Sequence, residues 1–584
     1  MNQENQAQTT PASSHHQVGV PDRLPRSERN HSSAGVPSPG EMNDVTSHRY
    51  TDGRPNLRRF HQARWDEPVI FELSREGQRA LLVPEVEESI RNEVGDVLAT
   101  LPERMRRQQP PALPELSQPQ VLRHYVRLSQ ENLGTDLNID VGQGTCTMKY
   151  SPKINDQLAR SPKMADLHPL QDEETVQGIL EIMARFEQIL KEISGMDRFS
   201  LQPGAGSAAI YTNASIIRAY HQSRGEARQR DEMITTIFSH PSNAACAKTA
   251  GFKIITLYPE ENGYPDLEAL KAAVSERTAG LMITNPEDTG IYNPQIADFV
   301  RVVHEVGGLC AYDQANANGV LGITRAKDAG FDLCHFNLHK TFSTPHGCGG
   351  PASGAVGVTQ ELARFLPVPV VEFDGERYYL DYDRPDSIGK IRPFYGNASV
   401  ILKAYAWVMS LGAAGLREVA EIAVLNNNYL LHKMLQIPGV AASYATGTRG
   451  PSPSTPQAHH TRRIEQVRYT WQELTEETGV HSEEIGLRAA DFGVHYWTSH
   501  HPWIVPEPCT LEPTESYAKD ELDEYAAILA HVANEARTDP DLVKAAPHSS
   551  TVHTIDHSPL DDPSRWAMTW RAYRRKMGNL AHGE

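Results

Sequence analysis

The stretch GLCAYDQANANGVLGITRAKDAGFDLCHFNLHK (308–340) contains the features on which the fold assignment depends. Its two apolar runs, GLCAYD (308–313) and FDLCHFN (331–337), are typical of buried strands. The first run ends in Asp313, and the second is followed by Leu338, His339 and Lys340. In a parallel sheet, ligands bind where the carboxyl ends of neighbouring strands meet. The stretch therefore predicts an α/β fold with an aspartate and a lysine at its functional edge.

The surrounding sequence repeats this alternation of strands and helices. Further apolar runs bounded by chain breakers are MITTIF (233–238), KIITL (253–257), GLMITN (280–285) and GAVGV (354–358). Helical patterns include DLEALKAAV (266–274), IADFVRVVHEV (296–306) and an apolar repeat over 176–193 that stops at Gly195. Strands that alternate with helices indicate a mostly parallel sheet covered on both faces.

Composition narrows the class of protein. The 584 residues carry a net charge of −18, which disfavours nucleic acid and anionic membranes as partners. No apolar run approaches the roughly 18 residues that span a bilayer, and the N-terminus lacks a secretory signal pattern. The six cysteines lack metal or disulfide-scaffold spacing, and no metal site is expected. We therefore expect a cytoplasmic enzyme. Residues 1–55 and 445–463 have the composition of a disordered tail and a flexible loop.

A third feature lies upstream of the two strand ends. PGAGSAA (203–209) is a glycine-rich turn that opens a helix, where free backbone N–H groups and Ser207 could hold a phosphate. Together with Asp313 and Lys340 this pattern suits pyridoxal phosphate. Lysine forms the Schiff base, aspartate pairs with the pyridinium nitrogen, and the helix start binds the phosphate. Each feature alone is common in other roles, but the ordered set is more specific.

One segment resembles a known family closely. NLHKTFSTPHGCGGPASGAVGV (337–358) is similar to the cofactor-lysine segment of the glycine cleavage system P-protein, in particular its separate bacterial subunit 2. Further similar segments are RHYVRLSQENLG (123–134), GTCTMKYSPKIN (144–155), LHPLQDEETVQG (167–178), RAYHQSRGE (218–226), LDYDRPDSIGKIRPFYGN (380–397) and IVPEPCTLEPTES (504–516). The resemblance implies a fold type I pyridoxal phosphate enzyme related to aspartate aminotransferase. Its expected parts are an N-terminal segment with an active-site loop (56–165), a large cofactor domain (166–400) and a smaller α+β C-terminal domain (401–584).

The resemblance also implies residue roles. Lys340 would form the internal aldimine, Asp313 would pair with the ring nitrogen, Ala315 would pack beneath the ring, and His240 would stack on it. Lys340, His240 and Asp313 are the expected catalytic residues. The residues expected to bind the cofactor are Gly206, Ser207, Ala208, His240, Thr284, Asp313, Ala315, His339 and Lys340. Those expected near the substrate are Cys146, Lys149, Tyr211, Asn243, His495, Tyr496 and Trp497.

The sequence departs from the family pattern mainly around the expected site. The family's turn, AGA followed by His or Gln and Gly-Glu, is AGSAAI here, and its HGTNPASA segment is HPSNAACA (240–247). DGAN becomes DQAN (313–316), HPPTVYFP becomes HYWTSHHP (495–502), and CMHEF has no counterpart near 463–467. The expected cofactor residues are kept while the substrate-facing surroundings change. This pattern favours a repurposed enzyme.

Three functions remain open from the sequence. The first is biosynthetic carbon–carbon bond formation on an amino acid with a γ-leaving group, such as S-adenosylmethionine. The enzyme would act through an external aldimine and a quinonoid carbanion. A nicotinamide co-substrate of the NAD type would stack on Tyr496, Trp497 and Tyr211. The second is a genuine glycine dehydrogenase subunit 2, and the third is a catalytically silent scaffold. We expect a small amino-acid substrate and either a homodimer or, for a true P-protein, a heterotetramer with a subunit 1 and a lipoylated carrier as partner.

Overall fold

The computed structural model describes residues 50–51, 54–58, 60–109, 111–134, 136–142, 149–347, 349–444, 462–499, 504–551 and 569. The chain divides into two units, Met1–Gly53 and Arg54–Glu584. In the first unit only β1 (Tyr50–Thr51) is described. Most of the expected disordered tail (1–55) and flexible loop (445–463) lies outside the described residues, and so does Cys146. All that follows concerns the second unit.

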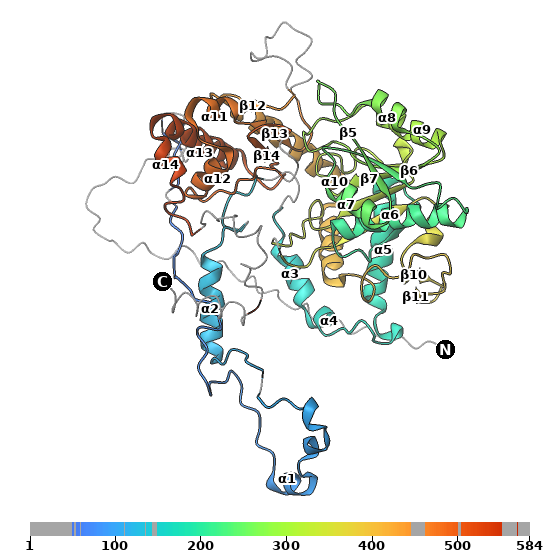
Figure 1. Cartoon of the computed structure of the whole chain (residues 1–584), viewed down its shortest axis with the longest axis vertical. Helices are drawn as coiled ribbons and strands as arrows, with labels where there is room; N and C mark the ends of the chain where they lie inside the picture. The colour runs from blue at the N-terminus through green and yellow to red at the C-terminus, as the bar shows by residue number, and fades with distance from the viewer. Residues whose placement is uncertain are drawn as a thin grey trace, which may run out of the picture. The chain divides into compact units, whose positions relative to one another are not determined.

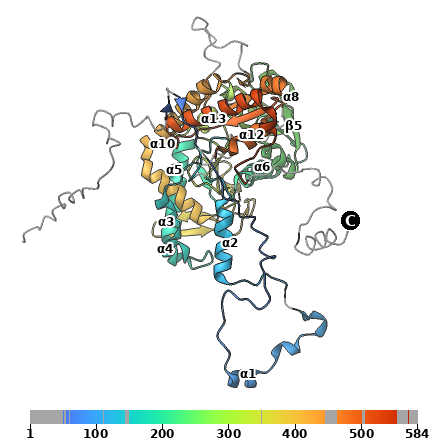
Figure 2. The same ribbon diagram turned by 90° about the vertical axis from the view of Figure 1, so that its left-hand side faces the viewer.

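The N-terminal part of this unit is mostly exposed. Its elements are β2 (Arg54–Pro55), α1 (Glu88–Val94), 3₁₀ turns at Val97–Thr100 and Glu103–Met105, α2 (Gln118–Gln130), α3 (Lys153–Arg160) and α4 (Pro162–Ala165). Residues 75–113, here called the arm, extend away from the rest of the unit in both views (Figures 1 and 2). None of the residues of α1 is buried. The arm therefore lacks a core of its own within the described chain.

The central sheet has seven described strands in the order β3-β9-β8-β7-β6-β4-β5. They are β3 (Arg198–Ser200), β4 (Glu232–Thr236), β5 (Lys253–Leu257), β6 (Thr278–Thr284), β7 (Leu309–Gln314), β8 (Leu333–Asn337) and β9 (Gly354–Val358). Strands β4 to β8 are parallel, as the alternating pattern predicts. β9 runs antiparallel to β8 because the connection between them contains no described crossover helix, which a parallel return needs.

Helices cover the sheet, and their apolar stripes build the core. They are α5 (Gln177–Ser194), α6 (Gly206–Ser223), α7 (Ser242–Thr249), α8 (Leu267–Ala273) and α9 (Ile296–Glu305), with 3₁₀ turns at Glu173–Thr175, Lys327–Ala329 and Ala363–Phe365. α5 buries the predicted stripe, including Leu180, Phe186 and Leu190. It ends at Gly195, whose φ of 76° is the left-handed conformation that glycine adopts without steric cost. A hairpin of β10 (Val370–Phe373) and β11 (Tyr378–Asp381) packs beside α5.

The long helix α10 (Ala398–Met434) connects the two cores of the unit. It contacts α3, α5 and α13, and it lies beside α5 and α3 in Figures 1 and 2. Gly412 breaks its helical geometry with φ 65° and ψ −177°, so the helix kinks there. Residues up to Ala420 pack in the sheet core, and residues from Leu430 pack in the C-terminal core. The two cores thus meet along α10, beyond the expected domain boundary at residue 400.

The C-terminal part combines a small antiparallel sheet with helices. The strands are β12 (Ala441–Ala442), β13 (Val467–Thr470) and β14 (Pro508–Leu511), in the order β12-β13-β14. The helices are α11 (Gln472–Thr478), α12 (Ser482–Ala490), α13 (Lys519–Thr538) and α14 (Pro540–Lys544). Trp471, Tyr469 and Tyr525 are fully buried between them. This is an α+β arrangement around a separate core.

A loop after β6 joins the large part to β13. The backbone N–H of Ile464 donates to the carbonyl of Gly290 at 3.0 Å, and Nε2 of Gln466 donates to the carbonyl of Glu287 at 3.1 Å. Buried Arg468 forms an ion pair with Asp288 of the same loop. These contacts between the loop after β6 and residues 463–468 are here called the seam. They bring the segment 463–468 up to the carboxyl edge of the central sheet.

Glu287 makes the stability of this seam dependent on pH. Burial raises its pKa from the usual 4.5 to about 7, against a hydrogen bond from the Thr236 hydroxyl that lowers it. The unfolded chain therefore loses this proton at lower pH than the folded protein, so stability falls as pH rises from about 4.5 to about 7. A shift of 2.5 units corresponds to on the order of 3 kcal/mol. Glu287→Gln is expected to unfold at higher denaturant concentration than the wild type at pH 8 but not at pH 4.5.

Urea unfolding of both proteins at the two pH values measures this difference. Glu268→Gln, at an exposed glutamate, is the control and should show no such pH dependence. A Glu287→Gln protein with the same stability difference at both pH values would contradict the assignment.

Candidate functional site

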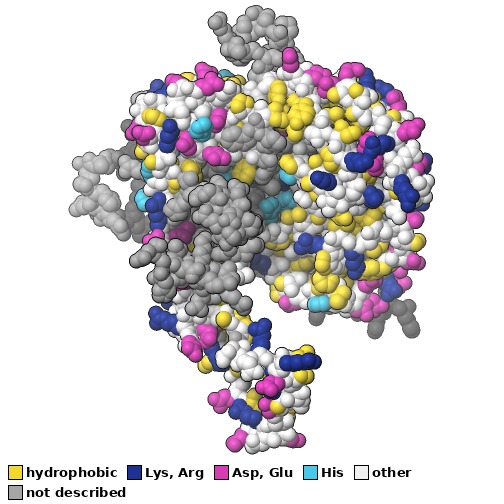
Figure 3. All heavy atoms as spheres, viewed as in Figure 1, with side chains coloured by type: hydrophobic (Ala, Val, Ile, Leu, Met, Phe, Trp, Pro, Cys, Tyr) yellow, Lys and Arg dark blue, Asp and Glu magenta, His cyan; other side chains and the backbone are white. Residues whose placement is uncertain are grey.

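A cavity of about 330 Å³ opens at the carboxyl edge of the central sheet, within the range usual for small-molecule sites. On the face shown in Figure 3, histidine side chains gather at a hollow near the middle of the molecule. The cavity is lined by Ala205, Gly206, Ser207, Ile210, His240, Ser242, Asp313, Ala315, Asn337, His339, Lys340, His346, Gly349, Gly350 and Ala352. The structure thus brings together most residues that the sequence analysis assigned to a cofactor.

Asp313, the penultimate residue of strand β7, is 3% exposed and contacted from three sides. Its Oδ2 accepts a hydrogen bond from Asn243 Nδ2 at 2.7 Å, and its Oδ1 accepts one from the backbone N–H of Ala315 at 3.0 Å. Nε2 of His335 lies 3.1 Å from Oδ1. Burial acts to raise the pKa of Asp313, but His335, Asn243 and Ala315 together lower it below its usual value. The site therefore presents an ionised carboxylate in a buried position.

Two histidines beside this carboxylate stay neutral. Burial lowers the pKa of His335 in spite of the nearby Asp313 charge. Burial, with a smaller effect of Lys340, lowers the pKa of His339 to about 3. Nδ1 of His339 lies 3.0 Å from the carbonyl of Ser353, which fixes the ring in the cavity wall. Burial thus shifts both imidazoles toward their neutral form.

Lys340 lies just beyond β8 and is 4% exposed. It lines the cavity, and among the described residues its amino group has no hydrogen bond or ion pair. Lys149 is different: its Nζ donates to the carbonyl of Thr341 at 3.1 Å, pairs with Glu515 at 3.0 Å and lies over the Trp407 ring. Lys149 thus supports the turn that carries Lys340 and does not line the cavity.

The start of α6 forms the other end of the cavity. Its first four backbone N–H groups have no partner within the helix, so the 18-residue helix presents donors and a partial positive charge there. Gly206 is needed for close approach, because a Cβ at this position would lie 2.5 Å from Asn337 Nδ2. Ser207 lines the same end, and Ala208 follows it in the helix. This cradle suits a phosphate group.

The residues present fit pyridoxal phosphate. The cavity combines an anion cradle, a buried carboxylate and a buried amine without a partner, in the order that this cofactor requires. His240 and Ala315 line the same cavity as these three groups. Nδ1 of His240 lies 2.5 Å from the hydroxyl oxygen of Ser242. Asn243, expected near the substrate, instead contacts Asp313 and is buried.

A second, smaller cavity of about 40 Å³ adjoins the first. Its lining residues are Phe238, His240, Thr284, Pro286, Asp288, Asp313, Ala315, Asn316, Lys340, Glu465 and Gln466. The two cavities share His240, Asp313, Ala315 and Lys340, but the second contains none of the residues of the phosphate cradle. It therefore lies on the side of Lys340 away from the cradle.

Several residues expected near the substrate do not line either cavity. Tyr211 lies on α6, one residue beyond Ile210. His495 pairs with Asp140, its Nδ1 2.7 Å from Oδ1, and Tyr496 packs against the C-terminal core. Trp497 is half-buried near His495. Cys146 lies outside the described residues.

Sequence reasoning missed several residues of the site, among them Asn337 and Glu465. Asn337 ends β8, and Glu465 enters the second cavity from the C-terminal part. The position of Asn337 at a strand end, two residues before His339, was a usable signal. No pattern in the sequence indicates that the segment before β13 returns to the central sheet.

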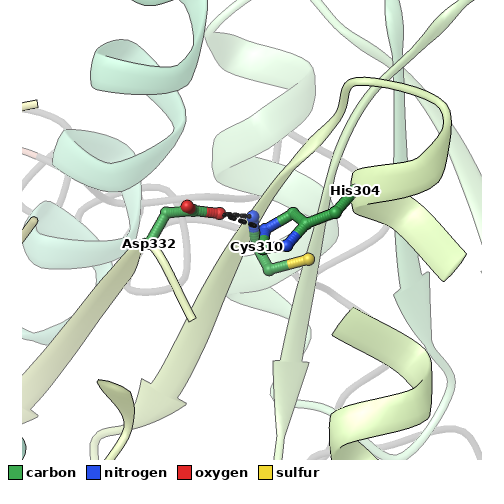
Figure 4. Close-up of side chains that lie close together, drawn as sticks. All are labelled: His304, Cys310 and Asp332. Atoms are coloured by element: carbon green, nitrogen blue, oxygen red, sulfur yellow. Dashed lines mark hydrogen bonds and ion pairs between the residues drawn. The ribbon is translucent and has the colours of Figure 1, made fainter. Parts of the chain in front are cut away.

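Three potential metal ligands, His304, Cys310 and Asp332, lie at the opposite end of the strands (Figure 4). Oδ2 of Asp332 is 2.8 Å from His304 Nε2 and accepts a hydrogen bond from the Cys310 backbone N–H at 2.8 Å. Burial raises the pKa of the Cys310 thiol well above its usual value, so the thiol stays protonated. We interpret the cluster as an ion pair that fastens the starts of β7 and β8.

Comparison with known proteins identifies the family models and relatives that this chain matches. The family model described as "Aminotransferase class-V" matches residues 207–364, and "Glycine dehydrogenase, C-terminal domain" matches residues 419–557. The chain is 47% identical over 517 residues to a "Probable glycine dehydrogenase (decarboxylating) subunit 2" of Pyrococcus horikoshii, covering 88% of this chain and 98% of that one. A protein of the same name from Alkaliphilus oremlandii is 41% identical over 496 residues, covering 84% and 96%.

Solved structures support the fold. The crystal structure of an inhibitor-bound glycine decarboxylase (P-protein) of the glycine cleavage system matches with a TM-score of 0.63 and 21% identity, covering 77% of this chain and 99% of that one. A NifS-like protein matches with a TM-score of 0.51 and 14% identity, covering 68% and 100%. The predicted fold type I architecture, with a mostly parallel sheet and a C-terminal domain, is confirmed.

Proposed function

The chain belongs to the family of glycine dehydrogenase (decarboxylating) subunit 2, and we propose that it removes the carboxylate of glycine with pyridoxal phosphate as cofactor. It is an enzyme of the pyridoxal phosphate class. The observation that carries the proposal is the arrangement of β7 and β8. They place an ionised Asp313 and the unpartnered amine of Lys340 in one cavity beside a phosphate cradle.

Each part of the site has a role in this proposal. Gly206, Ser207 and Ala208 would hold the phosphate, Asp313 would hold a proton at the pyridine nitrogen, and Lys340 would bind the cofactor covalently. When bound, pyridoxal phosphate accepts the electrons of the bond broken at the substrate α-carbon. Burial of Asp313 and Lys340 excludes water, which strengthens the charge interactions within the site.

The comparisons support the glycine hypothesis rather than carbon–carbon bond formation on S-adenosylmethionine with a nicotinamide co-substrate. That hypothesis came from the changed substrate-facing residues and expected the co-substrate ring to stack on Tyr496, Trp497 and Tyr211. None of these three residues lines either described cavity. A silent scaffold is disfavoured because His240, Asp313 and Lys340 meet in one cavity. The small volume beyond Lys340 also suits an amino acid without a large side chain.

An absorbance titration of the purified holoenzyme tests the proposal. Glycine is expected to perturb the cofactor band, and isotope from labelled bicarbonate is expected to exchange into the glycine carboxyl group. The same titration with S-adenosylmethionine is the comparison. A cofactor band that responds to the sulfonium and not to glycine would overturn the decarboxylase proposal in favour of the alternative.

We also propose that the chain works with a second, different subunit and a lipoylated carrier protein. The relatives are named subunit 2, so a subunit 1 is implied for them. The arm supplies a surface for such a partner, because it exposes apolar side chains such as Leu82 (86%) and Met105 (73%). Leu81, Leu82 and Val83 are consecutive and 75%, 86% and 77% exposed, and neighbouring exposed apolar side chains favour an interaction site.

Charge substitutions in the arm are expected to weaken assembly. A variant with Leu81→Asp, Leu82→Asp and Val83→Asp removes three apolar contacts, each worth about 1.5–3 kcal/mol if fully buried by a partner. Co-purification with the corresponding subunit 1 should therefore be lost, while the variant alone stays folded. Leu170→Asp, at an equally exposed leucine outside the arm, is the control. Undiminished co-purification of the triple variant would exclude the arm from the interface.

A cytoplasmic location is part of the proposal. One described helix, α10, is long and apolar enough to cross a membrane, but core helices of water-soluble proteins meet the same criteria. α10 supplies buried residues to both cores of the unit. The net charge of −18 gives no reason to expect a nucleic-acid partner.

A further inference from the structure

Glu465 reaches the second cavity from the C-terminal part of the chain. It lies two residues before β13 and is 1% exposed. It shares the cavity lining with His240, Asp313 and Lys340. Because the seam with the loop after β6 fixes both neighbours of Glu465, its backbone cannot move independently of the sheet edge.

Within the described ranges the carboxyl group of Glu465 has one protein partner, its own backbone N–H. Its Oε2 is buried and makes no hydrogen bond, and no ion pair to Glu465 occurs within the described ranges. Gly319 packs directly against it, since a Cβ at this position would lie 2.6 Å from Oε2. A buried carboxylate without a paired cation is strongly disfavoured, and the single backbone hydrogen bond does not offset burial, so the group holds its proton.

A second buried carboxyl group, Glu512, reinforces this state. Its Oε1 accepts hydrogen bonds from Asn316 Nδ2 at 2.7 Å and Asn318 Nδ2 at 2.8 Å, so Glu512 is the ionised member of the two. Burial, and then the charge of Glu512, raise the pKa of Glu465 well above its usual value. The other titratable and charged groups around Glu465 are Tyr312, Asp313 and Lys340 at the sheet edge, His240, Glu287 and Asp288 from the loops beside it, and Arg463 and Arg468 from its own segment.

The cavities offer few donors for the carboxylate that every amino-acid substrate carries. No arginine is among the residues that line either described cavity. Lys340 and His240 are assigned to the cofactor. Nε2 of Gln466 is used by the carbonyl of Glu287, and Nδ2 of Asn316 by Glu512. In the second cavity this leaves the hydroxyl of Thr284, whose Oγ1 is buried without a partner, and the carboxyl group of Glu465.

We propose that Glu465 is a substrate-binding residue, which donates a hydrogen bond from its carboxyl O–H to the carboxylate of the amino-acid substrate. This inference rests on the proposed function and names the group that recognises its substrate. A neutral donor stabilises the bound carboxylate less than a guanidinium would. This suits a reaction in which the carboxylate leaves as uncharged carbon dioxide, because tight binding of the starting charge would raise the barrier.

The expected pH dependence follows from the donor. Glycine binds while Glu465 is protonated, and above the pKa of this group each further pH unit weakens binding by up to tenfold. Glu465→Gln keeps a donor and removes the ionisation, so its affinity should lose this alkaline decline. Glu465→Leu removes the donor and should weaken binding about 10- to 100-fold, the usual effect of losing a hydrogen bond to a charged group.

Two measurements test the inference. The first is the dissociation constant of glycine, read from the cofactor absorbance of the holoenzyme between about pH 6 and pH 9. The second is infrared difference spectroscopy of wild type against Glu465→Gln, without and with glycine. A protonated carboxyl band should be present in the wild type, absent in the variant and shifted by glycine.

Glu287→Gln is the matched control, because it removes another buried carboxyl group that lines neither cavity. It should lose its own infrared band but keep the wild-type pH dependence of glycine binding. An unchanged pH dependence in Glu465→Gln, or a carboxyl band that glycine does not shift, overturns the inference and leaves the decarboxylase proposal standing. A wild-type holoenzyme that shows no response to glycine overturns both.

Discussion

Replacing Lys340 with alanine is expected to abolish covalent retention of pyridoxal phosphate and to lower turnover by roughly 10³-fold or more, as when other enzymes lose a covalent catalytic group. Lys340 is the lysine that lines both described cavities. Lys149, also buried nearby, cannot take its place because its Nζ is engaged by Thr341 and Glu515. The cofactor of the variant would therefore be held by non-covalent contacts alone.

Borohydride reduction followed by denaturation and peptide mapping measures this retention directly. In the wild type the label should remain on the peptide that contains Lys340, and in Lys340→Ala it should be lost. Lys149→Ala is the matched control, since it removes a second buried lysine but should keep the label on Lys340. Label that persists on the Lys340→Ala protein would show that another residue binds the cofactor.

The functional edge of the sheet could be predicted because local sequence determines it. A strand ends where its apolar run stops. The positions of Asp313 near the end of β7 and of Lys340 just beyond β8 could therefore be predicted. The glycine turn before α6 was equally local. Parallel neighbours then bring such ends together, whatever the intervening sequence.

The surroundings of these residues could not be predicted in the same way. Asn243 and His335 support Asp313 across different elements, and their sequence separations of 70 and 22 positions leave no periodic signal. Tyr496 has the composition of a stacking residue, yet it packs against the C-terminal core. Aromatic side chains serve both roles, and only tertiary packing distinguishes them.

Glu465 illustrates a related limit. A lone glutamate in a polar segment is ordinarily a solvated surface residue. Here the seam of Ile464 and Gln466 with the loop after β6 carries it to the sheet edge and buries it. The approach of two domains thus creates a site feature that neither domain's sequence indicates alone.

Asp313→Asn should lower kcat by about 10²–10³-fold, the usual effect of removing one preorganised electrostatic contact. The asparagine keeps the shape of the side chain but cannot carry a negative charge. In the wild type His335, Asn243 and Ala315 maintain that charge against the effect of burial. Without that charge the proton on the pyridine nitrogen is no longer stabilised, and the electron-accepting capacity of the ring declines. Cofactor binding should weaken less than turnover, because the phosphate cradle and Lys340 remain.

The pH dependence of the cofactor absorbance and of kcat separates this role from a merely structural one. In Asp313→Asn the absorbance should respond to pH near neutrality, where the wild type is constant, because the buried charge no longer fixes the ring nitrogen's proton. Asp332→Asn is the matched control: it removes an aspartate from the opposite end of β8, where it binds His304 and the Cys310 backbone. That variant should lose stability and keep the wild-type spectrum. An Asp313→Asn enzyme with kcat within threefold of the wild type would show that the strand-end carboxylate does not act on the cofactor.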